Sequence, residues 1–279
     1  MSYLERFRVR PGARVRLAEI DPSFKDRHDD QETAAGEIEQ YRKRLAELQE
    51  MLYVGHRRSL LICLQGLDTA GKDGTIRHFL SAMSPQGCTV SPFRQPSAAE
   101  AAHDFLWRVH RATPARGQVA IFNRSHYEDV LVVRVHGLAP RSVWSARYER
   151  INAFERGLVE SDTHVLKFFL HISSEEQLAR FKARLDDPTK LWKISESDYQ
   201  ERRFWNDYMT AYEEALSRCS TAQAPWFVIP SNHKWFRNLA VARIVVEHLE
   251  SLNLSYPKPT VDLERIRREY HAAKRAAGA

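Results

Sequence analysis

Five short apolar runs, separated by stretches with helical spacing, constrain the fold of this chain more than any other feature of its sequence. Each run is short for a helix and too uniformly apolar for a strand with one face in water, which is typical of strands buried on both faces of a parallel sheet. The runs are Ser59–Gln65, Cys88–Phe93, Gln118–Asn123, His164–Ile172 and Trp226–Pro230. Their alternation with helices predicts an α/β fold, a doubly wound parallel five-stranded sheet with helices on both faces.

The stretches between and around these runs repeat apolar residues every three or four positions, which predicts helices. The longest is Gln31–Val54, in which Ile38, Tyr41, Leu45, Leu48 and Leu52 share one face. Further helices are expected at Lys72–Met83, Ala98–Arg111, His126–Val135, Val143–Glu160, Trp235–Leu252 and Leu263–Ala277. The segment 174–219 interrupts the alternation, because it is expected to hold two charged, aromatic-rich helices around Asp186-Asp187-Pro188 and no strand.

These patterns divide the chain into three parts. Residues 1–55 form an N-terminal arm and helix, and the first 28 of them are short of periodic pattern. Residues 56–257 form the core, which includes the helical segment at about 174–219. Residues 258–279 form a C-terminal helical tail.

Composition indicates a folded protein with a sizeable core. Of the 279 residues, 43% are hydrophobic and 28% are charged, which excludes disorder through most of the chain. No apolar run approaches the roughly 18 residues that span a bilayer, and the N-terminus lacks the apolar core of a signal peptide. Three scattered cysteines, Cys63, Cys88 and Cys219, have neither disulfide-framework nor metal-ligand spacing. We therefore expect a soluble, cytoplasmic protein, and its net charge of +6 fits a polyanionic partner.

A glycine-bearing loop, Gly66–Lys72 (GLDTAGK), follows the first buried run and opens a predicted helix. It fits the pattern G-x-x-x-x-G-K, in which backbone N–H groups converge on phosphate oxygens and the helix N-terminus adds its dipole. Lys72 would place a cation against the transferred phosphate. The next residue is Asp73, so the hydroxyl that usually binds Mg²⁺ at this position is missing. The context of strand, loop and helix predicts a phosphate-binding site.

Asp68 lies inside this loop, where bound phosphates would repel its carboxylate. A metal ion between the carboxylate and the phosphates would remove that repulsion. The alternative is that Asp68 only makes a turn through its own backbone.

A second polar cluster follows the third buried run. Asn123 stands where a Walker B strand would end in Asp, and Arg124 beside it is a natural phosphate clamp. Glu128 and Asp129 come about one helical turn later. Three roles fit them: metal ligands, a base, or favourable charges near a helix N-terminus. Because ligands gather at the carboxyl ends of parallel strands, we expect this cluster beside the phosphate loop.

Five segments carry a likeness that extends from about Val9 to Pro257. They are Gly66–Thr75 (GLDTAGKDGT), His103–Arg108 (HDFLWR), Phe122–Val130 (FNRSHYEDV), Lys167–Ile172 (KFFLHI) and Arg184–Trp205. Together they resemble the polyphosphate kinase 2 family. The resemblance implies a P-loop core similar to thymidylate kinase, with a helical lid. It also implies transfer of phosphoryl groups between inorganic polyphosphate and nucleotides, in either direction, with Mg²⁺ or Mn²⁺.

One departure from the family pattern points to a subgroup. Many members have Asp-Arg-Ser-Trp-Tyr-Asn where this chain has Asn-Arg-Ser-His-Tyr-Glu at 123–128, so one carboxylate has moved from position 123 to Glu128. This resembles the class III subgroup, which phosphorylates both AMP and ADP. The resemblance implies adenine nucleotides as substrates, with guanine nucleotides as an option, and a homo-oligomer (dimer or tetramer). No nucleic-acid or membrane partner is expected.

The motifs and the resemblance together assign roles to individual residues. Catalytic roles are predicted for Asp68, Lys72, Arg124, Asp129 and Arg184. Phosphate or substrate binding is predicted for Gly66, Ala70, Gly71, Asp73, Gly74, Thr75, Arg77, Asn123, Glu128, Lys190 and Lys193. Mg²⁺ is expected on carboxylates, chiefly Asp68 with Glu128 or Asp129.

The segment 174–219 corresponds to the lid, and closing it over phosphates would exclude water. It carries the cations Arg180, Lys182, Arg184, Lys190, Lys193, Arg202 and Arg203 among the aromatic residues Phe181, Trp192, Phe204 and Trp205. Outside the lid, a track for a long phosphate chain is expected along Arg77, His103, Arg108 and Arg111, although solvated side chains would show the same spacing.

Two other functions fit parts of the sequence. An ATP-dependent nucleoside monophosphate kinase needs the same loop and lid, but it needs fewer basic residues. A nucleic-acid-binding module would use the basic helices, but it gives no reason for carboxylates to crowd a phosphate loop. We therefore expect a metal-dependent phosphotransferase that uses polyphosphate.

Overall fold

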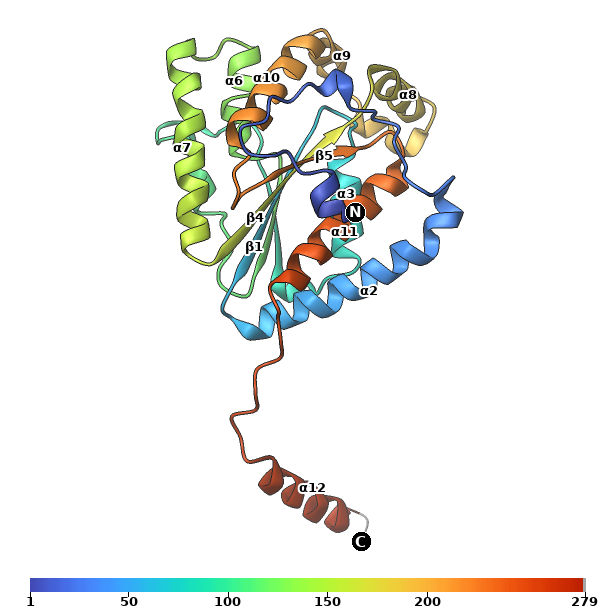
Figure 1. Ribbon diagram of the computed structural model, residues 1–279, viewed down its shortest axis with the longest axis vertical. Helices are drawn as coiled ribbons and strands as arrows, with labels where there is room; N and C mark the ends of the chain where they lie inside the picture. The colour runs from blue at the N-terminus through green and yellow to red at the C-terminus, as the bar shows by residue number, and fades with distance from the viewer. Residues whose placement is uncertain (278–279) are drawn as a thin grey trace.

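The computed structural model describes residues 1–277 and has the predicted α/β architecture (Figure 1). Five parallel strands form one sheet in the order β2–β3–β1–β4–β5. The strands are β1 Ser59–Gln65, β2 Cys88–Pro92, β3 Val119–Asn123, β4 Thr163–His171 and β5 Trp226–Pro230. Because all five run in one direction, their carboxyl ends lie at one edge of the sheet, where ligands bind in folds of this kind.

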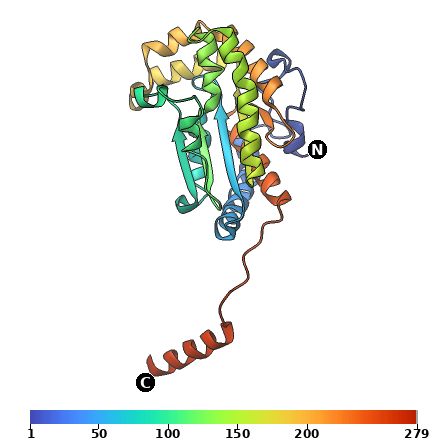
Figure 2. The same cartoon turned by 90° about the vertical axis from the view of Figure 1, so that its left-hand side faces the viewer.

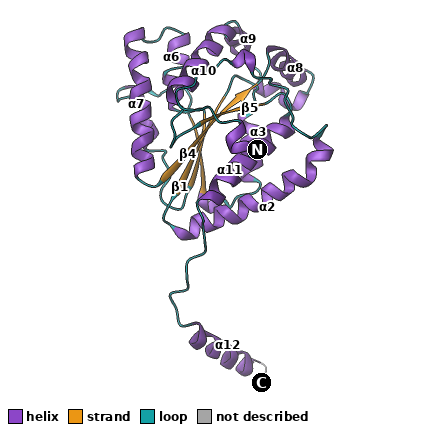
Figure 3. Ribbon diagram, viewed as in Figure 1, coloured by secondary structure: helices purple, strands orange, loops and turns teal. Residues whose placement is uncertain are grey.

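Helices cover both faces of the sheet, as Figure 3 shows. On one face lie α2 (Gln31–Gly55), α3 (Lys72–Leu80) and α11 (Lys234–Ser251), and on the other lie α7 (Arg141–Glu160) and α10 (Trp205–Cys219). Successive side chains of β1, the central strand, point alternately into the two cores. Leu60, Ile62 and Leu64 pack toward the first face, and Leu61 and Cys63 pack toward the second.

The N-terminal arm lies along the edge of the sheet. It contains the short helix α1 (Tyr3–Arg6) and a 3₁₀ turn, η1 (Leu17–Glu19). The N–H of Val9 donates to the carbonyl of Trp226 at 2.8 Å, and the N–H of Val228 donates to the carbonyl of Phe7 at 3.0 Å. The arm therefore pairs with β5, which would otherwise be an open sheet edge.

Two helices predicted as continuous are broken in the structure. The expected helix Ala98–Arg111 consists of α4 (Ala98–Ala101) and α5 (Trp107–His110). The Asp104 carboxylate accepts a hydrogen bond from the N–H of Leu106 at 2.9 Å, a local turn that competes with helix. The expected helix His126–Val135 consists of the 3₁₀ turn η3 (His126–Asp129) and α6 (Val132–Val135).

The lid segment contains four helical pieces where two helices were expected. They are α8 (Ser174–Leu185), η4 (Pro188–Lys193), α9 (Glu196–Arg202) and α10. The predicted break at Pro188 is present, and a second break precedes a capping box between Ser195 and Asp198. A further 3₁₀ turn, η2 (Pro85–Gly87), lies between α3 and β2.

The C-terminal helix α12 (Leu263–Ala277) projects from the body of the protein, on a strap that leaves the end of α11 (Figure 2). Every residue of α12 is exposed. None of the helices within residues 1–277 combines the length and the apolar character needed to cross a membrane.

Candidate active site

The loop between β1 and α3 lies at the carboxyl edge of the sheet. Gly71 has a φ of +107°, a left-handed conformation that favours glycine. A Cβ atom at this position would lie 1.7 Å from Nη1 of Arg237, so a side chain here would displace that guanidinium from beside the loop. The backbone conformation and the place of Arg237 both favour glycine at the second glycine of the motif.

Two buried arginines donate hydrogen bonds to the backbone of the loop. Arg180 of α8 is 6% exposed and donates to the carbonyls of Thr69 and Ala70 at 2.8 and 3.2 Å, and to two carbonyls after β5 at 2.5 and 2.9 Å. Arg237 of α11 is 3% exposed and donates to the carbonyl of Ala70 at 3.1 Å. Burial and the neighbouring Arg180 lower the pKa of Arg237 to about 9. Arg237 belongs to no sequence motif, and sequence analysis did not find it.

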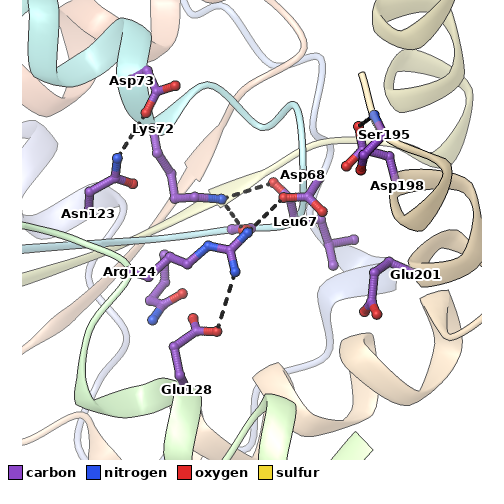
Figure 4. Close-up of polar contacts among 12 residues, drawn as sticks. Leu67, Asp68, Lys72, Asp73, Asn123, Arg124, Glu128, Ser195, Asp198 and Glu201 are labelled. Carbon is purple, nitrogen blue, oxygen red and sulfur yellow. Dashed lines mark hydrogen bonds and ion pairs between the residues drawn. The ribbon is translucent and has the colours of Figure 1, made fainter. Parts of the chain in front are cut away.

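Lys72 lies at the start of α3 with its side chain folded under the loop (Figure 4). Its Nζ donates to the carbonyls of Gly66 and Leu67 at 2.6 and 3.3 Å. Burial and the nearby Arg124 guanidinium lower the pKa of Lys72 to about 8, although three carboxylates oppose that shift. The ammonium group is thus held at the loop by backbone oxygens.

Arg124 lies between two of the predicted carboxylates (Figure 4). Its guanidinium is 3.0 Å from Asp68 and 3.8 Å from Glu128. Burial raises the pKa of Glu128, and Arg124 opposes the shift. The backbone of Arg124 has a φ of +62°, which is uncommon for a residue other than glycine, at the point where the chain leaves β3.

The two departures from the usual phosphate-loop pattern contact each other. Nδ2 of Asn123, at the end of β3, donates to Oδ1 of Asp73 on α3 at 2.8 Å (Figure 4). The amide at position 123 and the carboxylate at position 73 therefore face each other at the edge of the basic cavity.

Asp129 lies apart from these carboxylates. Its side chain pairs with Arg147 of α7 at 3.0 Å, and its backbone carbonyl accepts from the same guanidinium at 2.9 Å. Burial raises the pKa of Asp129 to about 6, although Arg147 opposes the shift. Among residues 1–277 there is no group of three or more His, Cys, Asp or Glu side chains arranged to hold a metal ion.

Two adjoining cavities open above the loop. The first has a volume of about 590 Å³ and is strongly basic. Its cations are Lys72, Arg94, Arg124, Arg180, Arg184, Lys190, Lys193, Lys234 and Arg237, and its anions are Asp68 and Asp73. The second has a volume of about 430 Å³ and is lined by carboxylates and aromatic rings, among them Glu128, Asp198, Glu201, Trp205, Tyr208 and Tyr212. Both cavities share Asp68, Gln95 and Arg124.

Most of the predicted site residues line these cavities. In addition to the side chains named above, Gly71, Gly74 and Asn123 line the first cavity, and Gly66 lines the second. Ala70 of the loop and Thr75 of α3 are buried, and Arg77 is exposed on α3. Sequence analysis missed Arg94, Gln95 and Lys234, because no local pattern distinguishes a cavity-lining side chain from a solvated one.

The predicted track lies outside the described linings of both cavities. His103 stacks on Trp107 with ring centroids 4.1 Å apart, and the guanidinium of Arg111 lies over the Trp107 ring, 4.9 Å from its centroid. Arg108 donates to the carbonyl of Arg94 at 2.7 Å. Arg108 therefore supports the strand-end loop that carries Arg94 into the basic cavity.

Comparison with known proteins agrees with this geometry. The family model described as Polyphosphate kinase 2 (PPK2) matches residues 27–257. The AMP/ADP-polyphosphate phosphotransferase of Meiothermus ruber is 46% identical over 264 residues, covering 94% of this chain and 99% of that protein. The ADP-polyphosphate phosphotransferase of Rhodopseudomonas palustris is 43% identical over 272 residues, covering 92% of this chain and 93% of that protein.

A solved structure gives the same result. The crystal structure of Polyphosphate Kinase 2 from Arthrobacter aurescens TC1 is 41% identical and has a TM-score of 0.94, covering 98% of this chain and 97% of that one. The match of sequence and fold extends over the phosphate loop, the polar residues 123–129 after β3, and the lid. This chain belongs to the polyphosphate kinase 2 family.

Proposed function

We propose that this chain is a polyphosphate:nucleotide phosphotransferase that phosphorylates AMP to ADP and ADP to ATP. The observation that carries the proposal is the pair of adjoining cavities, one strongly basic and one aromatic and acidic, which share Asp68 and Arg124 above the phosphate loop. The names of the Meiothermus and Rhodopseudomonas relatives support the reaction. Transfer would take place where the cavities meet.

The basic cavity fits the polyphosphate donor. Nine cations line it against two carboxylates. This excess of positive charge is larger than the three phosphates of one ATP would neutralise. Its cations come from α3, α8, α11, η4 and the ends of two strands, so they surround an extended anion from several sides. This excess favours polyphosphate over ATP as the donor.

The second cavity fits the nucleotide acceptor. Trp205, Tyr208 and Tyr212 give it aromatic surface for a base, and carboxylates such as Glu201 can accept hydrogen bonds from a base or a ribose. Arg124, on its border with the basic cavity, is placed to receive the terminal phosphate of the acceptor. The aromatic and acidic lining would not suit a polyphosphate chain.

Lys72 and Arg124 would carry the chemistry between the cavities. In phosphoryl transfer the protein positions the two substrates and neutralises charge on the transferred group. Lys72 would follow that group from donor to acceptor, while Arg184, Lys190 and Lys193 would reach it from the lid. The lid would also exclude water, which would otherwise accept the phosphoryl group in place of the nucleotide.

The donor set fits Mg²⁺ or Mn²⁺. Mg²⁺ is usually held by one or two carboxylates together with waters and substrate phosphates, so the site needs no cage made only of protein groups. Asp68 borders both cavities and Asp73 borders the basic one, while Glu128 lines the other cavity. We propose Asp68 as the principal ligand, with Glu128 favoured over Asp129 because Glu128 lines a cavity and Asp129 lies outside the described linings of both. When bound, the ion would neutralise phosphate charge.

The proposed function is tested by product analysis without ATP. Purified protein would be incubated with polyphosphate, Mg²⁺ and either AMP or ADP, and also with GMP and GDP to determine the base preference. We expect ADP from AMP, and ATP from ADP. Formation of ADP only when ATP replaces polyphosphate would instead identify a nucleoside monophosphate kinase.

The lowered pKa of Lys72 predicts slower phosphoryl transfer at alkaline pH. The free protein should lose the Lys72 charge as pH rises through about 8, well below the ordinary lysine value of 10.5. The value of kcat/KM for polyphosphate, which follows the protonation of the free enzyme, should therefore be highest below pH 8 and fall above it. In Lys72→Arg the guanidinium stays charged, so this decline should disappear. A decline of equal size in Lys72→Arg would contradict the assignment to Lys72.

Glu128 is expected to affect AMP more than ADP. AMP brings one phosphate fewer to the junction of the cavities, so its phosphorylation relies more on positioning groups there. Glu128→Asn should lower kcat/KM roughly 10-fold for AMP and only about 2-fold for ADP, in line with loss of a single positioning contact. Steady-state kinetics with both acceptors would measure this ratio. Equal losses would contradict the proposed role of Glu128.

A further inference from the structure

A buried polar cluster lies beneath the 3₁₀ turn that carries Glu128. Its members are His126 and Tyr127 of η3, Glu155 of α7 and Lys167 of β4, and each is at most 1% exposed. Four such side chains are costly to remove from water unless they satisfy one another. None of them lines either cavity, so the proposed reaction leaves their presence unexplained.

Glu155 is the acceptor at the centre of the cluster. Its Oε1 accepts from the Tyr127 hydroxyl at 2.9 Å and contacts Nε2 of His126 at 3.1 Å, while its Oε2 accepts from Lys167 at 2.5 Å. Burial alone would raise the pKa of Glu155, but Lys167 and His126 more than offset it and lower that pKa. Glu155 is therefore a carboxylate, and Nε2 of His126 donates to it.

Lys167 holds Glu155 in place and uses all three of its donors. Besides Glu155, its Nζ donates to the Tyr127 hydroxyl at 3.0 Å and to the carbonyl of Cys219 at 2.6 Å. Cys219 ends α10, the helix whose first half supplies Trp205 and Tyr208 to the second cavity. The cluster thus joins the turn after β3 to α7, β4 and α10.

His126 and Tyr127, which Glu155 anchors, lie between Arg124 and Glu128 in the chain. Arg124 and Glu128 flank Ser125, His126 and Tyr127, so the anchors limit where both site side chains can reach. Arg124 also has a left-handed backbone, a conformation that persists only when its surroundings hold it. A buried ion pair is by itself weak evidence for stability, because desolvation opposes its attraction.

We propose that Glu155, held by Lys167, is a positioning residue that fixes Arg124 and Glu128 against Asp68. The proposal rests on the proposed function in taking Arg124 and Glu128 to act on phosphates. Glu155 contacts no substrate and acts through His126 and Tyr127. Loss of its hydrogen bonds should therefore lower kcat and leave the affinity for polyphosphate in the basic cavity nearly unchanged.

Two double variants separate positioning from charge. Glu155→Gln/Lys167→Met and Glu155→Leu/Lys167→Met both remove the ion pair, but only the first keeps a side-chain oxygen that can accept from His126 and Tyr127. We expect kcat of the Leu/Met variant to be roughly 10-fold below that of the Gln/Met variant, with KM for polyphosphate within about 2-fold. Equal kcat values in the two variants would overturn the proposal.

A second readout does not depend on turnover. Hydrogen–deuterium exchange of the peptide spanning 124–131 should be faster in the Leu/Met variant than in the Gln/Met variant and the parent. Unchanged exchange there would also overturn the proposal. If the parent shows no transfer from polyphosphate, the proposed function fails, while the exchange result still decides whether Glu155 holds the turn.

Controls address folding. Tyr127→Phe removes one anchor with little change of volume, so it can be measured if the Leu/Met variant does not fold. It should reduce kcat and speed exchange at 124–131, and no change in either would count against the proposal. The pair Glu37 and Arg243, 2.9 Å apart, joins α2 to α11 away from the turn. Glu37→Gln/Arg243→Met should leave kcat and exchange at 124–131 unchanged.

Discussion

Replacing Lys72 with Ala is expected to lower kcat roughly 10²–10³-fold, because the variant loses a transition-state interaction of about 3–4 kcal/mol. The ammonium group lies under the loop, held by two carbonyls, at the start of the helix that faces the basic cavity. Loss of a charge that moves with the transferred group should affect kcat more than KM, since the other cations of the cavity would still bind polyphosphate.

The matched control for this prediction is Arg77→Ala. Arg77 is on the same helix but exposed and outside both described cavity linings, so its loss should leave kcat within about 2-fold. Steady-state kinetics of both variants, with circular dichroism to establish folding, would measure the difference. Near-parent turnover in a folded Lys72→Ala protein would exclude the phosphate-loop assignment.

Asp68→Asn is expected to raise the Mg²⁺ concentration needed for half-maximal activity by about 10–100-fold. The substitution keeps the shape of the side chain and an oxygen that can accept from Arg124, but it removes the negative charge proposed to hold the ion. Activity should therefore recover in part at high Mg²⁺. The measurement is a Mg²⁺ titration of the rate at saturating polyphosphate and ADP.

Asp129→Asn is the matched control for Asp68→Asn. Sequence analysis proposed both carboxylates as metal ligands, but Asp129 is paired with Arg147 and lies outside the described linings of both cavities. Its Mg²⁺ titration should have nearly the parent midpoint. A shift with Asp129→Asn and none with Asp68→Asn would reverse the assignment of the metal ligand.

The sheet and the phosphate loop could be predicted because their causes are local. Buried parallel strands are short apolar runs, and each predicted strand end is within one residue of its place in the structure. The loop is specified by glycines and a lysine within seven residues. Helix continuity was harder to predict, since the break at Asp104 depends on a side-chain hydrogen bond that periodicity does not record.

The supports of the site could not be predicted because they are distant in sequence. Arg180 reaches the carbonyl of Thr69 from 111 residues away, and Arg237 reaches that of Ala70 from 167 residues away. Nothing in the neighbourhood of either arginine distinguishes it from a solvated one. The same holds for Glu155 and Lys167, whose roles depend on how α7 and β4 pack beneath the turn.

The hydrogen bond between Asp73 and Asn123 limits how such a sequence can change over generations. A lineage that moved toward the more usual arrangement, with a hydroxyl residue at position 73 and Asp at position 123, would need two mutations. If Asn123 changed to Asp first, two carboxylates would face each other across about 2.8 Å, and one of them would have its pKa raised unless a cation lay between them. The order of the two changes is therefore constrained, and we expect position 73 to change before or together with position 123.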